Sequence, residues 1–345
     1  MDYTGLGRFI RYKLNRPLTD EERAGRLKPD KPASAEPQDW LSVIKINSTY
    51  MELVDRWYPV KGWWTWMGAM IAIPCLWAVV AFVLLALERN ELGGWIFVAL
   101  FGPIAGAFAW IALSMAHTEA FRLTHYPIRL NRKTRQVYAF RPDGTVIQAS
   151  WDDLFLCSVV NELTMWQSSD DVRAHVLAED GETVTDTFTL AYPYLGGKEA
   201  LMMLWEYIRR YMEESDGVER NYKLTKTCMP VDGRREGLVH GLVRTFAPYP
   251  KTLARYANWP ALQLLGSPLW AVTVVGRWLA MSTSKVPVWP AEVDAACQVD
   301  FDDPYQKDWR QNGKYDFYEL VWPVICFVVG LVVLVTGIVW LLSLI

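Results

Sequence analysis

The sequence predicts a membrane protein of mixed α and β structure, and three observations lead to this prediction. Three long runs contain no charged residue, at residues 67–87, 93–115 and 320–345. Between the second and third runs, short alternating segments bounded by turn residues are typical of antiparallel strands. Trp supplies 18 of 345 residues, and Trp is enriched where membrane proteins meet the lipid interface.

Each apolar run is long enough to cross a bilayer. As a helix, residues 67–87 would span about 31 Å, the thickness of one hydrocarbon core. The polar residues 88–91 join the first two runs, so we expect a transmembrane helical hairpin. Gly and Ala residues in the second run either form a face for close helix contact or reflect their general enrichment in such helices. Residues 320–345 predict a C-terminal transmembrane helix.

A fourth apolar segment, residues 259–281, is different because it contains Arg277 and two prolines. A central Arg costs about 2.5–3.5 kcal/mol on insertion into a bilayer. We therefore expect an amphipathic or re-entrant segment at the membrane interface, and whether it crosses the membrane stays open.

The N-terminal region has basic residues but no apolar core of a secretory signal peptide. The first apolar run is then expected to act as an uncleaved anchor. Residues 6–14 have helical spacing and predict a helix, either on a membrane surface or docked on the protein. Residues 16–37 are typical of a linker, and residues 40–58 predict a second short helix.

Lys and Arg gather on one side of the predicted spans, which indicates that this side faces the cytoplasm. The rule places the N-terminal arm and residues 116–319 in the cytoplasm. Only Arg89 lies in the hairpin turn. The Lys and Arg residues near the spans on the predicted cytoplasmic side are Arg56, Lys61, Arg122, Arg129, Arg132, Lys133, Arg135, Lys307, Arg310 and Lys314.

The middle region predicts about six strands followed by one amphipathic helix. A turn at Arg141-Pro142-Asp143-Gly144 is typical of a hairpin. Residues 198–214 form the helix, and Trp205 lies on its apolar stripe. This order resembles a pleckstrin-homology-like fold, in which Trp205 would plug the core. The predicted strands are residues 128–130, 136–140, 145–151, 154–160, 173–179 and 183–190.

The predicted chain has five parts. They are a cytoplasmic N-terminal arm at 1–66, the transmembrane hairpin at 67–115, a pleckstrin-homology-like antiparallel β-domain with one C-terminal helix at 116–216, a cytoplasmic or interfacial segment at 217–319, and the C-terminal transmembrane helix at 320–345.

The layout also resembles an uncharacterised family of proteobacterial inner-membrane proteins. Two segments carry the resemblance: N-R-x-T-x-x-V-Y-x-F-x-x-D-G at residues 131–144 and W-P-A-E-V at residues 289–293. Members of that family are associated with type VI secretion and polymorphic-toxin loci. The resemblance implies a multi-pass protein of the bacterial inner membrane with a role in competition between bacteria.

Few residue patterns indicate chemistry. His117, Glu119 and His125 could hold a metal, or they are polar residues at a helix end. The pairs Asp152-Asp153 and Asp170-Asp171 are interpreted as turn or cap residues, because adjacent acids on a strand face opposite sides. We expect no catalytic residue, no cofactor and no metal. The five cysteines are widely spaced and predict no disulfide framework.

Five residues are candidates for binding a lipid headgroup or a partner: Arg129, Arg132, Lys133, Arg135 and Trp289. In lipid-binding pleckstrin-homology domains, a basic first hairpin binds phosphorylated headgroups. Arg129, Arg132, Lys133 and Arg135 resemble that basic hairpin. The same charges would equally satisfy the topology rule. Trp289 lies between Pro287 and Pro290, so it is either a rigid docking side chain or a structural clip.

The sequence thus favours a non-enzymatic inner-membrane protein whose cytoplasmic domain binds a protein partner. The resemblance implies an immunity or accessory protein whose partner is a toxin or secretion component. The alternatives are a membrane enzyme and a protein that binds lipid headgroups. Transporters commonly place charges within their spans, and these three runs have none. We expect contact with membrane lipid and none with nucleic acid, and the oligomeric state stays open.

Overall fold

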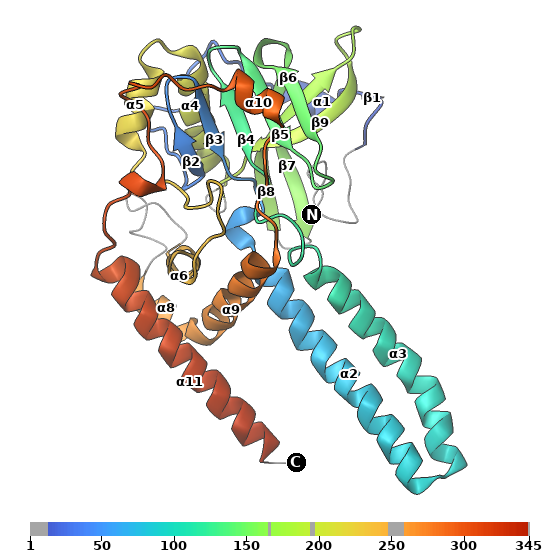
Figure 1. Cartoon of the computed structure of the whole chain (residues 1–345). Helices are drawn as coiled ribbons and strands as arrows, with labels where there is room; N and C mark the ends of the chain where they lie inside the picture. Colours follow the sequence, from blue (N-terminus) through green and yellow to red (C-terminus); the bar gives the residue numbers. More distant parts are fainter. Residues whose placement is uncertain (1–12, 165–166, 194–196, 248–258, 344–345) are drawn as a thin grey trace. The chain divides into compact units, whose positions relative to one another are not determined.

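The computed structural model describes residues 13–164, 167–193, 197–247 and 259–343 (Figure 1). The chain forms two compact units. We call the first the β unit; it comprises Met1–Pro59, Leu123–Pro260 and Val286–Pro323. We call the second the helical unit; it comprises Val60–Arg122, Ala261–Lys285 and Val324–Ile345. Most of the helix predicted at residues 6–14 lies outside the described residues.

All three predicted apolar runs form helices that are long and apolar enough to cross a membrane, as in a multi-pass membrane protein. They are α2 (Trp63–Arg89), α3 (Leu92–Ala116) and a helix over Phe317–Leu342, whose regular part is α11 (Trp322–Leu342). Large apolar side chains are exposed along all three helices, as lipid contact requires.

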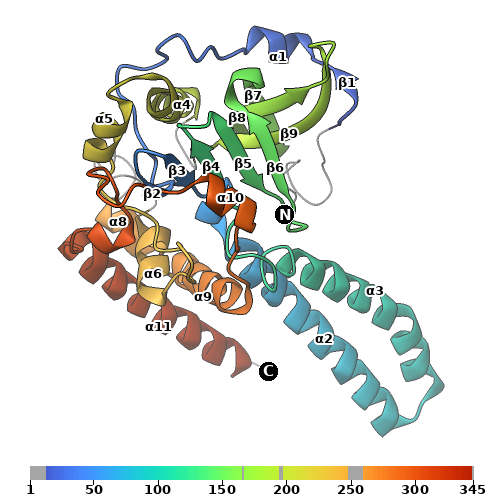
Figure 2. The same ribbon diagram turned by 45° about the horizontal axis from the view of Figure 1, so that its top comes forward.

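The helices α2 and α3 lie side by side as the predicted hairpin (Figures 1 and 2). They approach each other closely at Gly68, where an added Cβ would lie 2.4 Å from the carbonyl oxygen of Ala112. The contact on α3 is made by Ala112, which is buried, and by Ala116, whose Cβ would lie 2.8 Å from the added atom. The glycines of α3 differ in their surroundings: a Cβ on Gly94 would lie 3.4 Å from Ala86 of α2, whereas one on Gly106 would meet no described atom within 4 Å.

Residues 259–281 form two helices, α8 (Pro260–Leu265) and α9 (Ser267–Thr283). Arg277 is 1 % exposed inside the helical unit, and its guanidinium donates to the carbonyl of Lys61 at 3.4 Å. The backbone of α9 also approaches the start of α2 closely, since a Cβ on Gly62 would lie 2.3 Å from the amide nitrogen of Arg277. Arg277 is therefore a packing residue of this unit.

The β unit contains two antiparallel sheets, one of them curled into a half-barrel (Figure 2). Five strands form one sheet in the order β2-β3-β4-β5-β6, and four form the other in the order β1-β9-β8-β7. The strands are β1 (Arg16–Pro17), β2 (Val43–Ile46), β3 (Tyr50–Leu53), β4 (Ile128–Asn131), β5 (Gln136–Phe140), β6 (Val146–Ser150), β7 (Phe155–Thr164), β8 (Gln167–Leu177) and β9 (Thr183–Ala191).

The six strands predicted after the hairpin are confirmed, but two predictions for the N-terminal region are wrong. Residues 40–58 form β2 and β3 instead of a helix, because β3 pairs with β4 across the inserted hairpin, with Leu53 opposite Ile128. Residues 16–37 are more than a linker, since they include β1 and α1 (Asp20–Ala24). The helix α1 begins at a capping box formed by Thr19 and Glu22.

The helix α4 (Gly197–Glu213) confirms the predicted amphipathic helix, and its apolar stripe is buried in the main core. Trp205 is 1 % exposed and packs with residues of both sheets in that core. The remaining helices are shorter: α5 (Gly217–Leu224), α6 (Leu238–Phe246) and α10 (Ala291–Ala296). Residues from before and after the spans thus complete the β unit.

Candidate functional site

Arg129, the first of the predicted binding cations, lies inside the β unit. It is 4 % exposed, and its guanidinium donates to Glu52 at 2.6 Å and to Asp294 at 2.6 Å. The same guanidinium lies 4.8 Å from the ring centroid of Tyr50 and 4.6 Å from that of Trp289. Burial alone would lower the pKa of Arg129, but Glu52 raises it above its ordinary value. The side chain joins β3, β4 and α10.

The other three cations of this hairpin also have partners. Arg132 donates to the carbonyls of Tyr211 and Glu214 at the end of α4. Lys133 pairs with Asp300 at 2.8 Å, and both side chains are exposed. Arg135 pairs with Asp152 and Glu213, and these hydrogen bonds raise its pKa. These contacts tie the hairpin to α4 and to the segment after α10, so the cations do not form an open basic patch.

Trp289 packs as a clip. It is 9 % exposed, and its ring meets Phe140 edge to face with centroids 5.1 Å apart. Arg129 covers the ring, so a cation and an aromatic edge hold the indole. Its neighbour Val288 is 79 % exposed instead. The segment presents Val288 to the surface rather than the Trp ring.

Glu119 has a structural role at the start of the first span. Its carboxylate is fully buried and accepts from the amides of Gly62 and Thr65, at 2.8 and 3.1 Å, and from the Thr65 hydroxyl at 3.0 Å. It therefore caps the N-terminus of α2, where a negative charge is favourable. Burial raises the Glu119 pKa. Within the described residues, no three His, Cys, Asp or Glu side chains gather as a metal site would require.

One of the two predicted acidic pairs lies in a buried ion cluster. Asp171 is fully buried in β8, where it accepts from Arg56 at 2.8 Å and from the Thr189 hydroxyl at 3.0 Å. Arg173 lies 3.4 Å from the other carboxylate oxygen. The prediction of a turn or cap is therefore wrong for Asp171, because β8 continues through it. Asp152 instead pairs with Arg135.

A second buried cluster was not predicted. Glu22 of α1 accepts two hydrogen bonds from Arg16, at 2.6 and 2.8 Å, and lies 3.2 Å from Nε2 of His175. Burial would raise the pKa of Glu22, but the bond from Arg16 and that from Thr19 hold it at about 2. Burial lowers the His175 pKa to about 4. The capping-box pattern at Thr19 could have predicted α1 from the sequence. No residue near His175 in the sequence indicates that it is buried beside Glu22.

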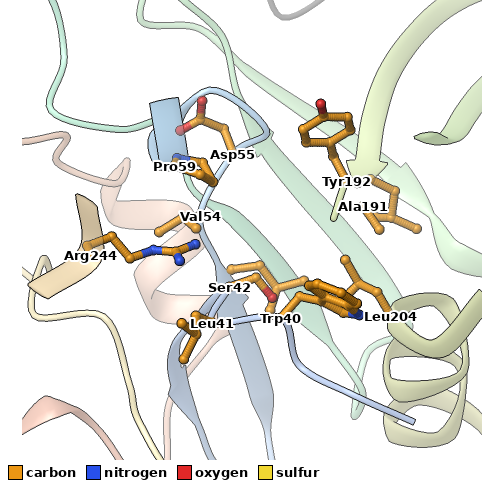
Figure 3. A pocket seen from close by; sticks show the side chains of 12 residues that line it. Trp40, Leu41, Ser42, Val54, Asp55, Pro59, Ala191, Tyr192, Leu204 and Arg244 are labelled. Atoms are coloured by element: carbon orange, nitrogen blue, oxygen red, sulfur yellow. The ribbon is translucent and has the colours of Figure 1, made fainter. Parts of the chain in front are cut away.

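A small pocket between the sheets and α6 is too small to hold a ligand (Figure 3). Its volume is about 10 Å³, close to that of one water molecule. Trp40 lies beside Leu204 in it, and Arg244 reaches in from α6 (Figure 3). Trp40 and Leu41 both adopt left-handed backbone angles, with φ of 49° and 52°. Non-Gly residues adopt this conformation at a cost, and such strain gathers at functional sites.

A much larger cavity shares Leu41 and Arg244 with that pocket. Its volume is about 590 Å³, within the range of pockets that hold small ligands. Three stretches of the β unit line it: residues 38–41, residues 224–247 and residues 307–319. Asp39 lines the cavity and is buried. Burial raises the pKa of its carboxyl to about 6, although the positive charge of Arg244 acts in the opposite direction. This cavity is the candidate site with room for a ligand.

A family model described as a family of unknown function, DUF6708, matches residues 105–300. The chain belongs to the DUF6708 family. The DUF6708 match runs from within α3, through β4–β9 and α4, to just beyond α10, and it contains Arg129, Trp289 and α6. No curated protein and no solved structure matches the chain.

Proposed function

We propose that this DUF6708 protein works without turnover, by holding a protein partner at the cytoplasmic face of a bacterial inner membrane. The partner would bind at the edge of β6 by adding a strand to the five-stranded sheet. Strand addition uses backbone hydrogen bonds for affinity and alternate side chains for specificity. The observation that carries this proposal is the direction of the β6 backbone groups.

The hydrogen-bond pattern fixes that direction. The amide of Trp151 donates to the carbonyl of Arg135 at 2.8 Å, and the amide of Arg141 donates to that of Thr145 at 2.8 Å. Hydrogen-bonded pairs alternate along an antiparallel ladder, so the odd-numbered residues of β6 bond to β5. The backbone groups of Val146, Gln148 and Ser150 therefore point away from β5.

The outer strands β2 and β7 are covered over part of their length. At β2, the amide of Met229 donates to the Val43 carbonyl at 2.7 Å, and Lys307 exchanges two backbone bonds with Ile46. At β7, the amide of Leu27 donates to Leu156 at 2.8 Å. In the described part of the chain, no backbone group pairs with the outer side of β6. An unpaired edge of this kind is a template for another strand.

We also interpret the β unit as pleckstrin-homology-like. The strands β3-β4-β5-β6 run as one meander, β7-β8-β9 follow as a second, and α4 then closes the core with Trp205. The hairpin α2–α3 is inserted between β3 and β4, in the first loop of the first meander. What supports this interpretation is the order of the elements.

The cellular role is proposed from the resemblance and from the charges. The segments at residues 131–144 and 289–293 resemble a family associated with type VI secretion and toxin loci, which favours a toxin or secretion component as the partner. Lys and Arg beside the spans favour a cytoplasmic β unit. The protein would then act as an immunity protein or as a delivery accessory.

The binding edge is tested with the pair Gln148→Pro and Gln148→Ala. Pro removes an amide that points away from β5, so the sheet keeps its internal bonds, whereas Ala leaves that amide in place. Affinity purification of the full chain in detergent, followed by mass spectrometry, should recover a partner with wild type and Gln148→Ala but not with Gln148→Pro. Equal recovery with both variants would contradict docking at β6.

The role is tested by deleting the gene in a strain that produces the toxins and competing it against its parent. An immunity protein predicts that the deletion strain is killed by its siblings, and an accessory predicts that toxin delivery stops. Unchanged survival together with unchanged delivery would remove the interbacterial assignment.

A further inference from the structure

The lysines that line the large cavity of the β unit differ from those of the first hairpin. Lys226, Lys307 and Lys314 line it together with Arg244, against two carboxylates, Asp39 and Glu319. Within the described residues, none of the three lysines lies within 4 Å of a carboxylate oxygen. In contrast, Arg129, Lys133 and Arg135 are all in ion pairs. The cavity therefore carries an excess of positive charge.

Lys307 is the most firmly held of these lysines. Its ammonium donates to the carbonyls of Tyr222 and Thr225, at 2.8 and 2.9 Å, and lies 4.1 Å from the ring centroid of Tyr222. Neutral carbonyls fix the position of the ammonium without cancelling its charge. An ammonium has three N–H groups, so one remains for a further acceptor. Lys226 and Lys314 are exposed at the cavity surface.

The wall of the cavity is tied covalently to a membrane span. Lys314 precedes by three residues the helix over Phe317–Leu342, so even a fully extended chain separates them by only about 10 Å. Phe317 and Tyr318 are exposed, at 52 % and 65 %, as aromatic residues at a membrane interface are. The part of the cavity wall that carries Lys314 is therefore close along the chain to the start of that helix.

The helix α6 forms another wall of the cavity, and it also combines basic residues with exposed apolar ones. His240 and Arg244 face the cavity, and Nδ1 of His240 lies 2.9 Å from the Tyr315 hydroxyl, which joins α6 to the segment before the span. Leu238 and Val239 are exposed at 47 % and 53 %. An apolar surface beside a basic one is typical of segments that rest on anionic lipid.

We propose that this cavity binds the phosphate headgroup of an anionic membrane lipid. Lys226, Lys307 and Lys314 contact the phosphate, and the hydroxyl of Thr227, which also lines the cavity, contacts a headgroup hydroxyl. Basic residues directly beside a span bind anionic headgroups in this way. The site differs from the first hairpin, whose cations are engaged within the fold.

The test uses the full chain purified in a neutral detergent and native mass spectrometry to count bound lipid. The probes are short-chain phosphatidylglycerol, short-chain phosphatidylcholine and free glycerol 3-phosphate. The cavity variant Lys226→Gln/Lys314→Gln is compared with Lys28→Gln/Lys31→Gln, which changes two exposed lysines elsewhere by the same charge. Thermal unfolding of each variant, measured in parallel, checks that it is folded.

We expect wild type and the control variant to retain phosphatidylglycerol about tenfold more tightly than phosphatidylcholine, and the folded cavity variant to lose about tenfold. Equal retention by the cavity and control variants would overturn the site. Tighter binding of glycerol 3-phosphate than of the lipid would overturn the lipid assignment and indicate a soluble phosphate ester. Neither result depends on the β6 edge, so the two proposals fail separately.

Discussion

Trp151 and Trp205 stack in the core of the β unit, with ring centroids 5.9 Å apart and ring planes 20° apart. Trp151 follows β6 and Trp205 lies on α4, so the stack joins the open sheet to the helix that closes it. Nε1 of Trp151 donates to Glu213 at 2.6 Å, which satisfies the polar atom of this buried indole.

Replacing Trp205 with Ala should lower the free energy of unfolding by about 3–5 kcal/mol, because a large buried side chain is lost and a cavity is left. Phe301 is 99 % exposed in the same unit and serves as the matched control. Chemical unfolding in detergent would measure both variants. A Phe301→Ala change should stay within about 0.5 kcal/mol. Equal effects of the two substitutions would contradict a core role for Trp205.

Replacing Arg129 with Ala should destabilise the protein by about 3–5 kcal/mol, because Glu52 would be left buried without its partner. The double variant Arg129→Met/Glu52→Leu removes both charges and should recover much of that loss. Unfolding free energies of the single and double variants make the comparison. If Arg129→Ala were as stable as wild type and only lost lipid binding, the headgroup role expected for this hairpin would be favoured instead.

The stability of the protein should depend on pH through His175. Burial lowers its folded pKa to about 4, so the unfolded chain takes up the proton at a higher pH than the folded one. The stability that His175 contributes is therefore complete above about pH 6.5 and is lost as the pH falls towards 4. Between pH 7.5 and 4.5 the loss should be about 2.5 kcal/mol.

The pH measurement compares wild type with His175→Phe, because other buried groups titrate nearby. Glu22, whose pKa is held at about 2 in the folded chain, is present in both proteins, so its own contribution is shared by them. Asp39, with a pKa of about 6, acts in the opposite direction but is present in both proteins. Between pH 7.5 and 4.5, wild type should lose about 2.5 kcal/mol more unfolding free energy than His175→Phe. A constant difference would mean that His175 does not titrate as described.

Local patterns were enough to predict the spans, the strands β4–β9 and the helix α4. Each of these elements carries its own periodicity and is bounded by its own turn residues, as at Arg141–Gly144. Even the burial of Trp205 followed from its position on the apolar stripe of one helix. These features depend on neighbours within about a dozen residues.

The features that could not be predicted depend on partners far away in the chain. The strand β3 is buried at all four positions, so it lacks the alternation that marks a strand, and it pairs with β4 across the hairpin. The buried position of Arg129 likewise depends on ion pairs with Glu52 and Asp294, which are both far from it in the sequence. The cavity was missed for the same reason, since its walls come from three separate stretches.

The most direct test of the account is a measurement of topology, because the proposed function requires the β unit to face the cytoplasm. Paired reporters, one active only in the cytoplasm and one only outside it, would be fused at Gly144 in the exposed β5–β6 turn and after Ile345. The account predicts opposite compartments, with Gly144 in the cytoplasm. Reporters on the same side, or Gly144 outside, would contradict it.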